Sequence, residues 1–112
     1  MALIEMQSID RDRLLDAISG AVLGLLDAGI REDMVGIVAG GLQFLITGED
    51  GERLDDSDLR CMGDHEDALA GMLFCDLRSG WQGFPGEEDK QDAWTVCNII
   101  AAAFVKSVQG GL

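Results

Sequence analysis

The sequence predicts a mostly α-helical protein that folds as a compact bundle of about four helices in a single domain, residues 1–112. Three observations support this fold class. Apolar residues recur at helical spacing in four segments, and Gly-rich or polar stretches separate those segments. The hydrophobic fraction is 47 %, which is typical of a globular chain with a core.

The first helix is expected from about Asp10 to Ala28. Ser8 or Asp10 can act as its N-cap, because a side-chain oxygen there can accept a bond from an unpaired backbone N–H. Gly29 is a suitable C-terminal residue, since glycine enters the left-handed conformation without a steric penalty. The expected apolar face consists of Leu14, Ile18, Ala21, Val22, Leu25 and Leu26.

The second helix is expected from about Arg31 to Ile46. Its first turn carries Glu32 and Asp33, which the positive end of the helix dipole favours. A wide apolar face predicts that this helix is the most buried, with Met34, Val35, Ile37, Val38, Leu42 and Leu45 facing inward. A short β-hairpin near 42–54 is the alternative for its end, with a turn at Asp50-Gly51.

The third region begins after a polar stretch. Ser57 can cap a short helical turn through Met62, and Asp64 can cap the main helix, with Asp67 completing an approximate capping box. This helix is expected to end at Ser79-Gly80. Its apolar residues are Ala68, Leu69, Met72, Leu73, Cys75 and Leu77.

The fourth helix is expected from about Glu87 to Gln109. Its main apolar stripe is Ala93, Cys97, Ile100, Phe104 and Val108, widened by Trp94, Ala101 and Val105. The preceding linker, Ser79–Gly86, holds Trp81 and Phe84. These two aromatic side chains either anchor a binding interface or fold back over the end of the bundle.

Two Gly-x-x-x-Gly pairs occur in the first two helices, Gly20 with Gly24 and Gly36 with Gly40. A glycine inside a helix costs about 1 kcal/mol relative to alanine. The pairs therefore predict close helix packing, either within the chain or across a dimer.

The chain carries 21 Asp and Glu against 8 Lys and Arg, a formal net charge of −13. Nine carboxylates and two arginines between Glu49 and Asp67 leave −7 in that stretch. A second cluster at Glu87–Asp92 is explained by its position at a helix start. The first cluster is either a solvated face or a surface for a basic partner, and its candidate residues are Glu49, Asp50, Glu52, Asp55, Asp56, Asp58, Asp64, Glu66 and Asp67.

No cofactor, metal site or catalytic site is expected, and the protein is predicted not to be an enzyme. The acidic stretch fits no register of an EF-hand loop. Cys61 and His65 have no further residues at zinc-ligand spacing. Cys75 and Cys97 are expected to be small core residues. An odd number of cysteines without a secretory signal predicts free thiols in a soluble, cytoplasmic protein.

Direct nucleic-acid binding is not expected, because Arg11 and Arg13 lie among Asp10, Asp12 and Asp16 as material for ion pairs within one helix. No segment has the length of apolar sequence that a membrane span needs.

In size, charge and lack of catalytic motifs, the chain resembles small acidic inhibitors of phages and mobile elements: anti-defence proteins, immunity proteins and nucleic-acid mimics. This resemblance assigns no residue. It implies an acidic binding protein that blocks a basic surface of a protein partner, such as a nucleic-acid-binding effector. A self-associating scaffold subunit, possible as a homodimer, is the first alternative, and a small enzyme or metal-binding protein is the second.

Overall fold

The structure is a computed structural model that describes residues 9–48, 54–81 and 87–110. The helical class is confirmed, with no strand among these residues. The described residues form one more helix than expected, because the short turn predicted before the third helix is an eight-residue helix of its own. The helices are α1 (Arg11–Asp27), α2 (Glu32–Thr47), α3 (Asp56–Gly63), α4 (Glu66–Trp81) and α5 (Glu87–Gly110).

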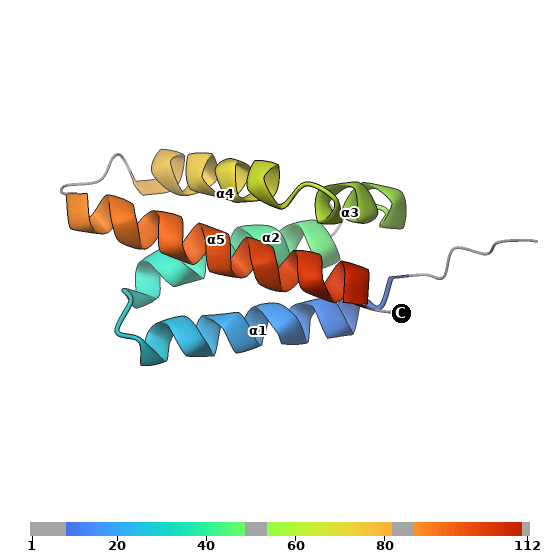
Figure 1. Cartoon of the computed structure of the whole chain (residues 1–112), viewed down its shortest axis with the longest axis horizontal. Coiled ribbons are helices and arrows are strands. Elements are labelled where there is room, and N and C mark those ends of the chain that lie inside the picture. The colour runs from blue at the N-terminus through green and yellow to red at the C-terminus, as the bar shows by residue number, and fades with distance from the viewer. Residues whose placement is uncertain (1–8, 49–53, 82–86, 111–112) are drawn as a thin grey trace, which may run out of the picture.

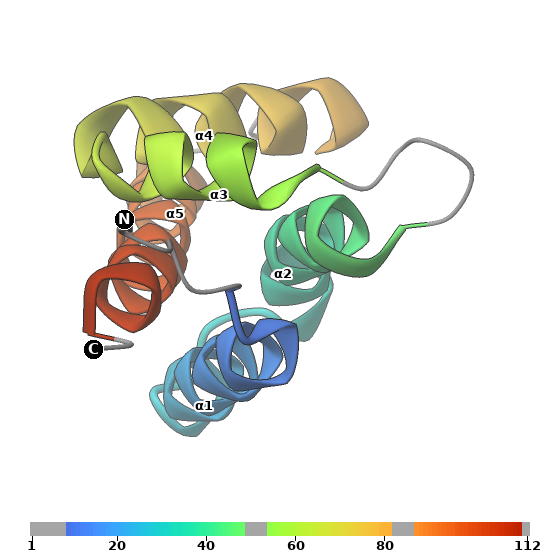
Figure 2. The same ribbon diagram turned by 90° about the vertical axis from the view of Figure 1, so that its right-hand side faces the viewer.

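Helices α1, α2, α4 and α5 run alternately up and down the bundle (Figure 1). Viewed along the bundle, α2 and α5 each lie between α1 and α4, and they also contact each other (Figure 2). Helix α3 lies at one end and packs on α5 and α4. The short connections make neighbouring helices antiparallel, as in up-and-down bundles.

The core among the described residues is entirely apolar. Phe104, Leu14 and Leu42 are fully buried at its centre, and burying a side chain of this size contributes about 1.5–3 kcal/mol. The predicted stripe of α5 is confirmed, except that Trp94 is 39 % exposed. The prediction for Ile37 is wrong: it is 40 % exposed, because the apolar residues of α2 extend beyond the face that contacts the core.

Both ends of α1 follow from local sequence. The Asp10 side chain accepts from the backbone N–H of Arg13 at 3.1 Å, which confirms the predicted N-cap. At the other end, Gly29 adopts φ 87°. The N–H of Ile30 donates to the carbonyl of Leu25, and the N–H of Gly29 to that of Leu26, which is the Schellman arrangement. This turn reverses the chain into α2.

The hairpin alternative is wrong for the described part of 42–54, because Leu42–Thr47 is helical. The chain nevertheless returns to the end of α2, since the N–H of Leu54 donates to the carbonyl of Leu45 at 2.8 Å. Residues 49–53, where the turn was expected, lie outside the described residues.

The helix starts after this point differ from the expected ones. Asp55, rather than Ser57, caps α3 by accepting from the N–H of Asp58 at 2.8 Å. Asp64, expected to cap the main helix, is the C-cap residue of α3, and α4 begins at Glu66.

The predicted close packing within the chain at Gly20, Gly24, Gly36 and Gly40 is wrong. A Cβ added at any of the four would meet nothing within 4 Å, because these glycines lie on exposed faces of α1 and α2. The close approach is instead at Gly63. A Cβ there would lie 2.8 Å from Cγ1 of Val108, so this glycine lets α3 pack against α5.

Candidate functional site

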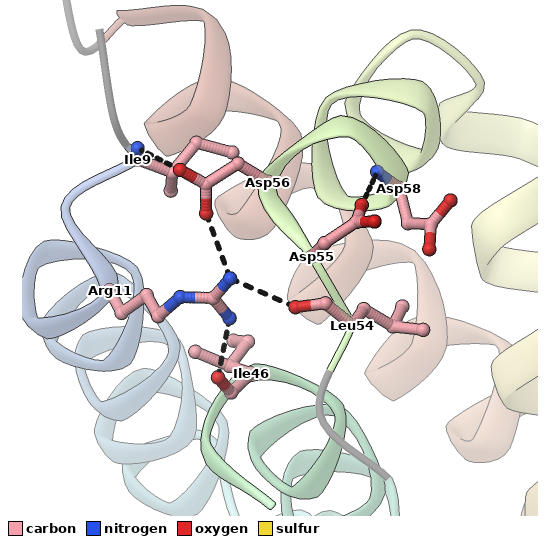
Figure 3. Close-up of polar contacts among 7 residues, drawn as sticks. All are labelled: Ile9, Arg11, Ile46, Leu54, Asp55, Asp56 and Asp58. Atoms are coloured by element: carbon pink, nitrogen blue, oxygen red, sulfur yellow. Dashed lines mark hydrogen bonds and ion pairs between the residues drawn. The ribbon is translucent and has the colours of Figure 1, made fainter. Parts of the chain in front are cut away.

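The described carboxylates of the predicted acidic cluster form what we call the acidic corner: Asp55, Asp56, Asp58, Asp64, Glu66 and Asp67. Arg11, in the first turn of α1, reaches this corner (Figure 3). Its guanidinium donates to the carbonyl of Ile46 at 2.6 Å, to the carbonyl of Leu54 at 2.9 Å and to Oδ1 of Asp56 at 2.8 Å. The Oδ2 atom of Asp56 accepts from the backbone N–H of Ile9 at 3.0 Å. One side chain thus joins the start of α1, the end of α2 and the start of α3.

Electrostatics favours this junction at each end. The carbonyl of Ile46 is one of the last four in α2, which have no partner inside their helix, and a cation is favoured at that position. Asp56 is the first residue of α3, where an anion is favoured. The Ile9 N–H, and then Arg11, hold the pKa of the Asp56 carboxyl below its ordinary value.

The Arg11 junction changes two sequence-based expectations. Arg11 was expected to pair with Asp10, Asp12 or Asp16 along its own helix, and it pairs instead with Asp56, 45 positions away. Asp56 itself was a candidate for a basic partner, and its carboxylate is engaged within the chain. Nothing in the local pattern of charges distinguishes Asp56 from its acidic neighbours, so the sequence could not assign this role.

The other described carboxylates of the cluster face solvent. Asp58, Asp64, Glu66 and Asp67 are exposed along α3, the α3–α4 junction and the start of α4. Asp55 is also exposed, although its side chain caps α3. The remaining candidates of the cluster lie outside the described residues: Glu49, Asp50 and Glu52.

The two aromatic candidates are only partly placed. Trp81 is the last residue of α4 rather than part of a linker, and Phe84 lies outside the described residues. The other tryptophan, Trp94, stacks on Phe74 with ring centroids 4.0 Å apart, which joins α5 to α4.

An apolar groove of about 430 Å³ lies between α3 and α4, beside the acidic surface. Leu69 is buried at its base, and Leu54 and Met62 are half-buried. Ala68 and Met72, two of the apolar residues named for the predicted third helix, line this groove and are exposed. The surplus of apolar residues in α4 was a signal for the groove, because one helix face cannot bury them all.

The groove has acidic side chains at its edges. Asp58 lines it directly, and Asp76 follows Met72 by four residues, which places the two on one side of α4. Arg60 and Arg78 follow Asp58 and Asp76 by two residues each. Because each helical residue turns about 100° from the previous one, each arginine lies on the side of its helix opposite that carboxylate. His65 also lines the groove, and its Nδ1 atom is 3.0 Å from the carbonyl oxygen of Cys61.

The three cysteines are free and differ in their surroundings. Cys97 is buried as predicted, and burial raises the pKa of its thiol to about 12. The prediction for Cys75 is wrong, since it lies on an exposed side of α4. Cys61 is exposed at the groove. Among the described residues, no three His, Cys, Asp or Glu side chains are grouped to hold a metal ion.

The outward side of α2 is apolar and lacks charge. Phe44 is 52 % exposed and lies on the same side as Ile37, with Gly40 and Gly41 between them. No charged residue occurs in the segment 34–48. This surface, called the α2 face below, is separate from the acidic corner.

None of the described helices is both long enough and apolar enough to cross a membrane. A scan against protein-family models found no match, and searches of curated proteins and of solved structures found no significant match.

Proposed function

We propose that this chain is a non-enzymatic binding protein that uses its acidic corner to occupy a basic surface of a partner protein and so inhibits that partner. The observation that carries the proposal is the outward orientation of Asp58, Asp64, Glu66 and Asp67, in a stretch whose carboxylates outnumber its arginines by seven. The nearby Asp56 has an internal partner, whereas these four face solvent.

Carboxylates gathered on one surface attract Lys- and Arg-rich surfaces over distance and speed association at low salt. Basic nucleic-acid-binding grooves recognise phosphates by the same attraction. A protein partner that binds nucleic acid is therefore the best match, with the carboxylates standing in place of phosphates. An inhibitor of the nucleic-acid-mimic class would act in this way, which is what the resemblance to small acidic anti-defence and immunity proteins implies.

Affinity capture on the immobilised full chain tests the proposal. Proteins retained from the source cell at low salt are eluted with rising salt, and the basic ones are then mixed with labelled nucleic acid and the chain. We expect the chain to displace the nucleic acid, and the displacement to weaken as salt rises. No change in nucleic-acid occupancy would contradict the mimic mechanism.

A matched pair of variants assigns the effect to the surface. Asp58→Lys with Asp67→Lys reverses two carboxylates of the acidic corner, and Asp16→Lys with Asp27→Lys reverses two exposed carboxylates of α1. Both variants change the net charge equally. The first is expected to slow association about tenfold or more, and the second far less. Equal slowing would show that total charge, not this surface, drives binding.

Self-association is a second candidate, favoured by the α2 face. Ile37 and Phe44 expose apolar surface on this face. An added Cβ at Gly40 or Gly41 would meet nothing within 4 Å, so a second helix can approach the backbone closely there. Light scattering tests this by measuring the molar mass of the protein at a concentration of roughly tens of micromolar, where a dimer with a Kd in the micromolar range would be populated. A monomer removes the candidate, and a dimer that Phe44→Lys dissociates supports it.

A further inference from the structure

We infer that the groove between α3 and α4 seats one amphipathic helix of the partner, with apolar residues on one side and Lys or Arg on its flanks. The inference rests on the proposed function and names the segment that the acidic corner recognises. It draws on three properties of the described residues: the apolar lining, the charges at the groove edges and the adaptable methionines.

The lining indicates that the bound segment is a helix. Leu54, Met62, Leu69 and Met72 offer no hydrogen-bonding side-chain groups to a peptide backbone. A segment placed against them must satisfy its own backbone N–H and C=O groups, and a helix does so internally. A groove between two helices is also the usual seat of an amphipathic helix, whereas adding a strand requires a sheet edge. The described residues contain no strand.

The charges at the edges indicate that the bound helix is basic. Asp58 lies on the α3 side, and Asp76 lies one turn beyond Met72 on the α4 side. Arg60 and Arg78 point to the other sides of their helices. Lys or Arg on the flanks of a bound helix would therefore meet carboxylates on both sides of the groove.

The groove also offers apolar surface that can hold a bound helix, which exposed charges alone do weakly. A solvent-exposed ion pair contributes about 1 kcal/mol or less, so carboxylates alone give fast but weak binding. Apolar side chains buried in a pocket give most of the holding affinity of an interface. Met62 and Met72 suit this role, because the flexible, polarisable methionine side chain adapts to different apolar partners.

The test measures binding of two labelled synthetic peptides to the full chain by fluorescence anisotropy. Both peptides consist of the same Leu and Lys residues. In one, leucines follow the i, i+3, i+4, i+7 spacing of a helix face, and in the other they are spread evenly around the helix. The chain variant Met72→Lys places a cation in the groove. Its matched control is Leu23→Lys, since Leu23 is also an exposed apolar residue (63 %) and lies in α1, which does not line the groove. Circular dichroism checks that both variants fold.

The amphipathic peptide is expected to bind about tenfold or more tightly than its rearranged isomer. Met72→Lys should remove most of that advantage, and Leu23→Lys should leave it. Equal binding of both peptides, or equal losses in both variants, would overturn the groove and leave the charge-based proposal standing. No binding of either peptide at low salt would contradict the acidic corner as well. Binding of a small apolar dye in the groove without the peptide preference would also overturn the inference.

Discussion

Arg11→Ala should destabilise the protein far more than an exposed arginine substitution does. The Arg11 side chain is 14 % exposed. From the start of α1 it donates to Ile46 at the end of α2 and to Leu54 and Asp56 at the start of α3. Hydrogen bonds that involve a charged group contribute about 1.5–3 kcal/mol each. The three share one side chain and water can replace part of them, so we expect a total loss of about 2–4 kcal/mol.

Urea denaturation followed by circular dichroism measures this loss, and a decrease of that size corresponds to a fall in Tm of roughly 10 °C or more. Arg13→Ala is the control, because Arg13 is exposed in the same helical turn, and it should change the stability by about 0.5 kcal/mol or less. A double-mutant cycle with Asp56→Ala should give a coupling of about 1 kcal/mol or more. If Arg11→Ala costs no more than Arg13→Ala, the junction does not hold the three segments together.

Other substitutions test the fold. The pKa of Asp56 is lower in the folded state than in the unfolded state, so Asp56 stabilises the fold above the unfolded pKa of about 3.9. This stabilisation is lost as the pH falls through the folded pKa. Asp56→Asn should therefore reduce the loss of stability on acidification, measured by urea denaturation. Gly63→Ala should cost about 1–3 kcal/mol in urea denaturation, because its Cβ would collide with Val108. Gly40→Ala should raise the free energy of unfolding by up to about 1 kcal/mol, and Tm with it, since its Cβ would meet open space. A loss of stability would instead indicate an interface at Gly40. Gly29→Ala should lower the stability by about 1 kcal/mol, because φ is 87°.

Local rules predicted the parts of the fold that depend on local sequence. Asp10 caps α1, Gly29 ends it, and the α5 stripe from Ala93 to Phe104 is buried, because capping, left-handed turns and helical spacing are properties of short segments. Helix starts were less predictable after Gly48, where many acidic residues can each act as a cap. Asp55 rather than Ser57 is the N-cap of α3, and the local sequence alone does not distinguish the two.

The relationships between distant segments could not be predicted. Arg11 bonds to residues 35 to 45 positions away, and no spacing rule connects them. Likewise, the apolar side chains of α4 divide between the core and the groove according to where α3 packs. Met72 and Leu73 are neighbours in sequence, yet Met72 lines the groove and Leu73 is in the core. The acidic corner was visible in the sequence, and the groove beside it needed the structure.

NMR of the full chain during addition of the amphipathic Leu/Lys peptide tests the groove most directly, because the backbone amide signals report where the peptide binds. We expect the largest shifts at Asp58, Met62 and Met72, on both sides of the groove. Shifts centred on Ile37 and Phe44, or spread evenly over all the acidic helix starts, would show that the peptide does not bind in the groove.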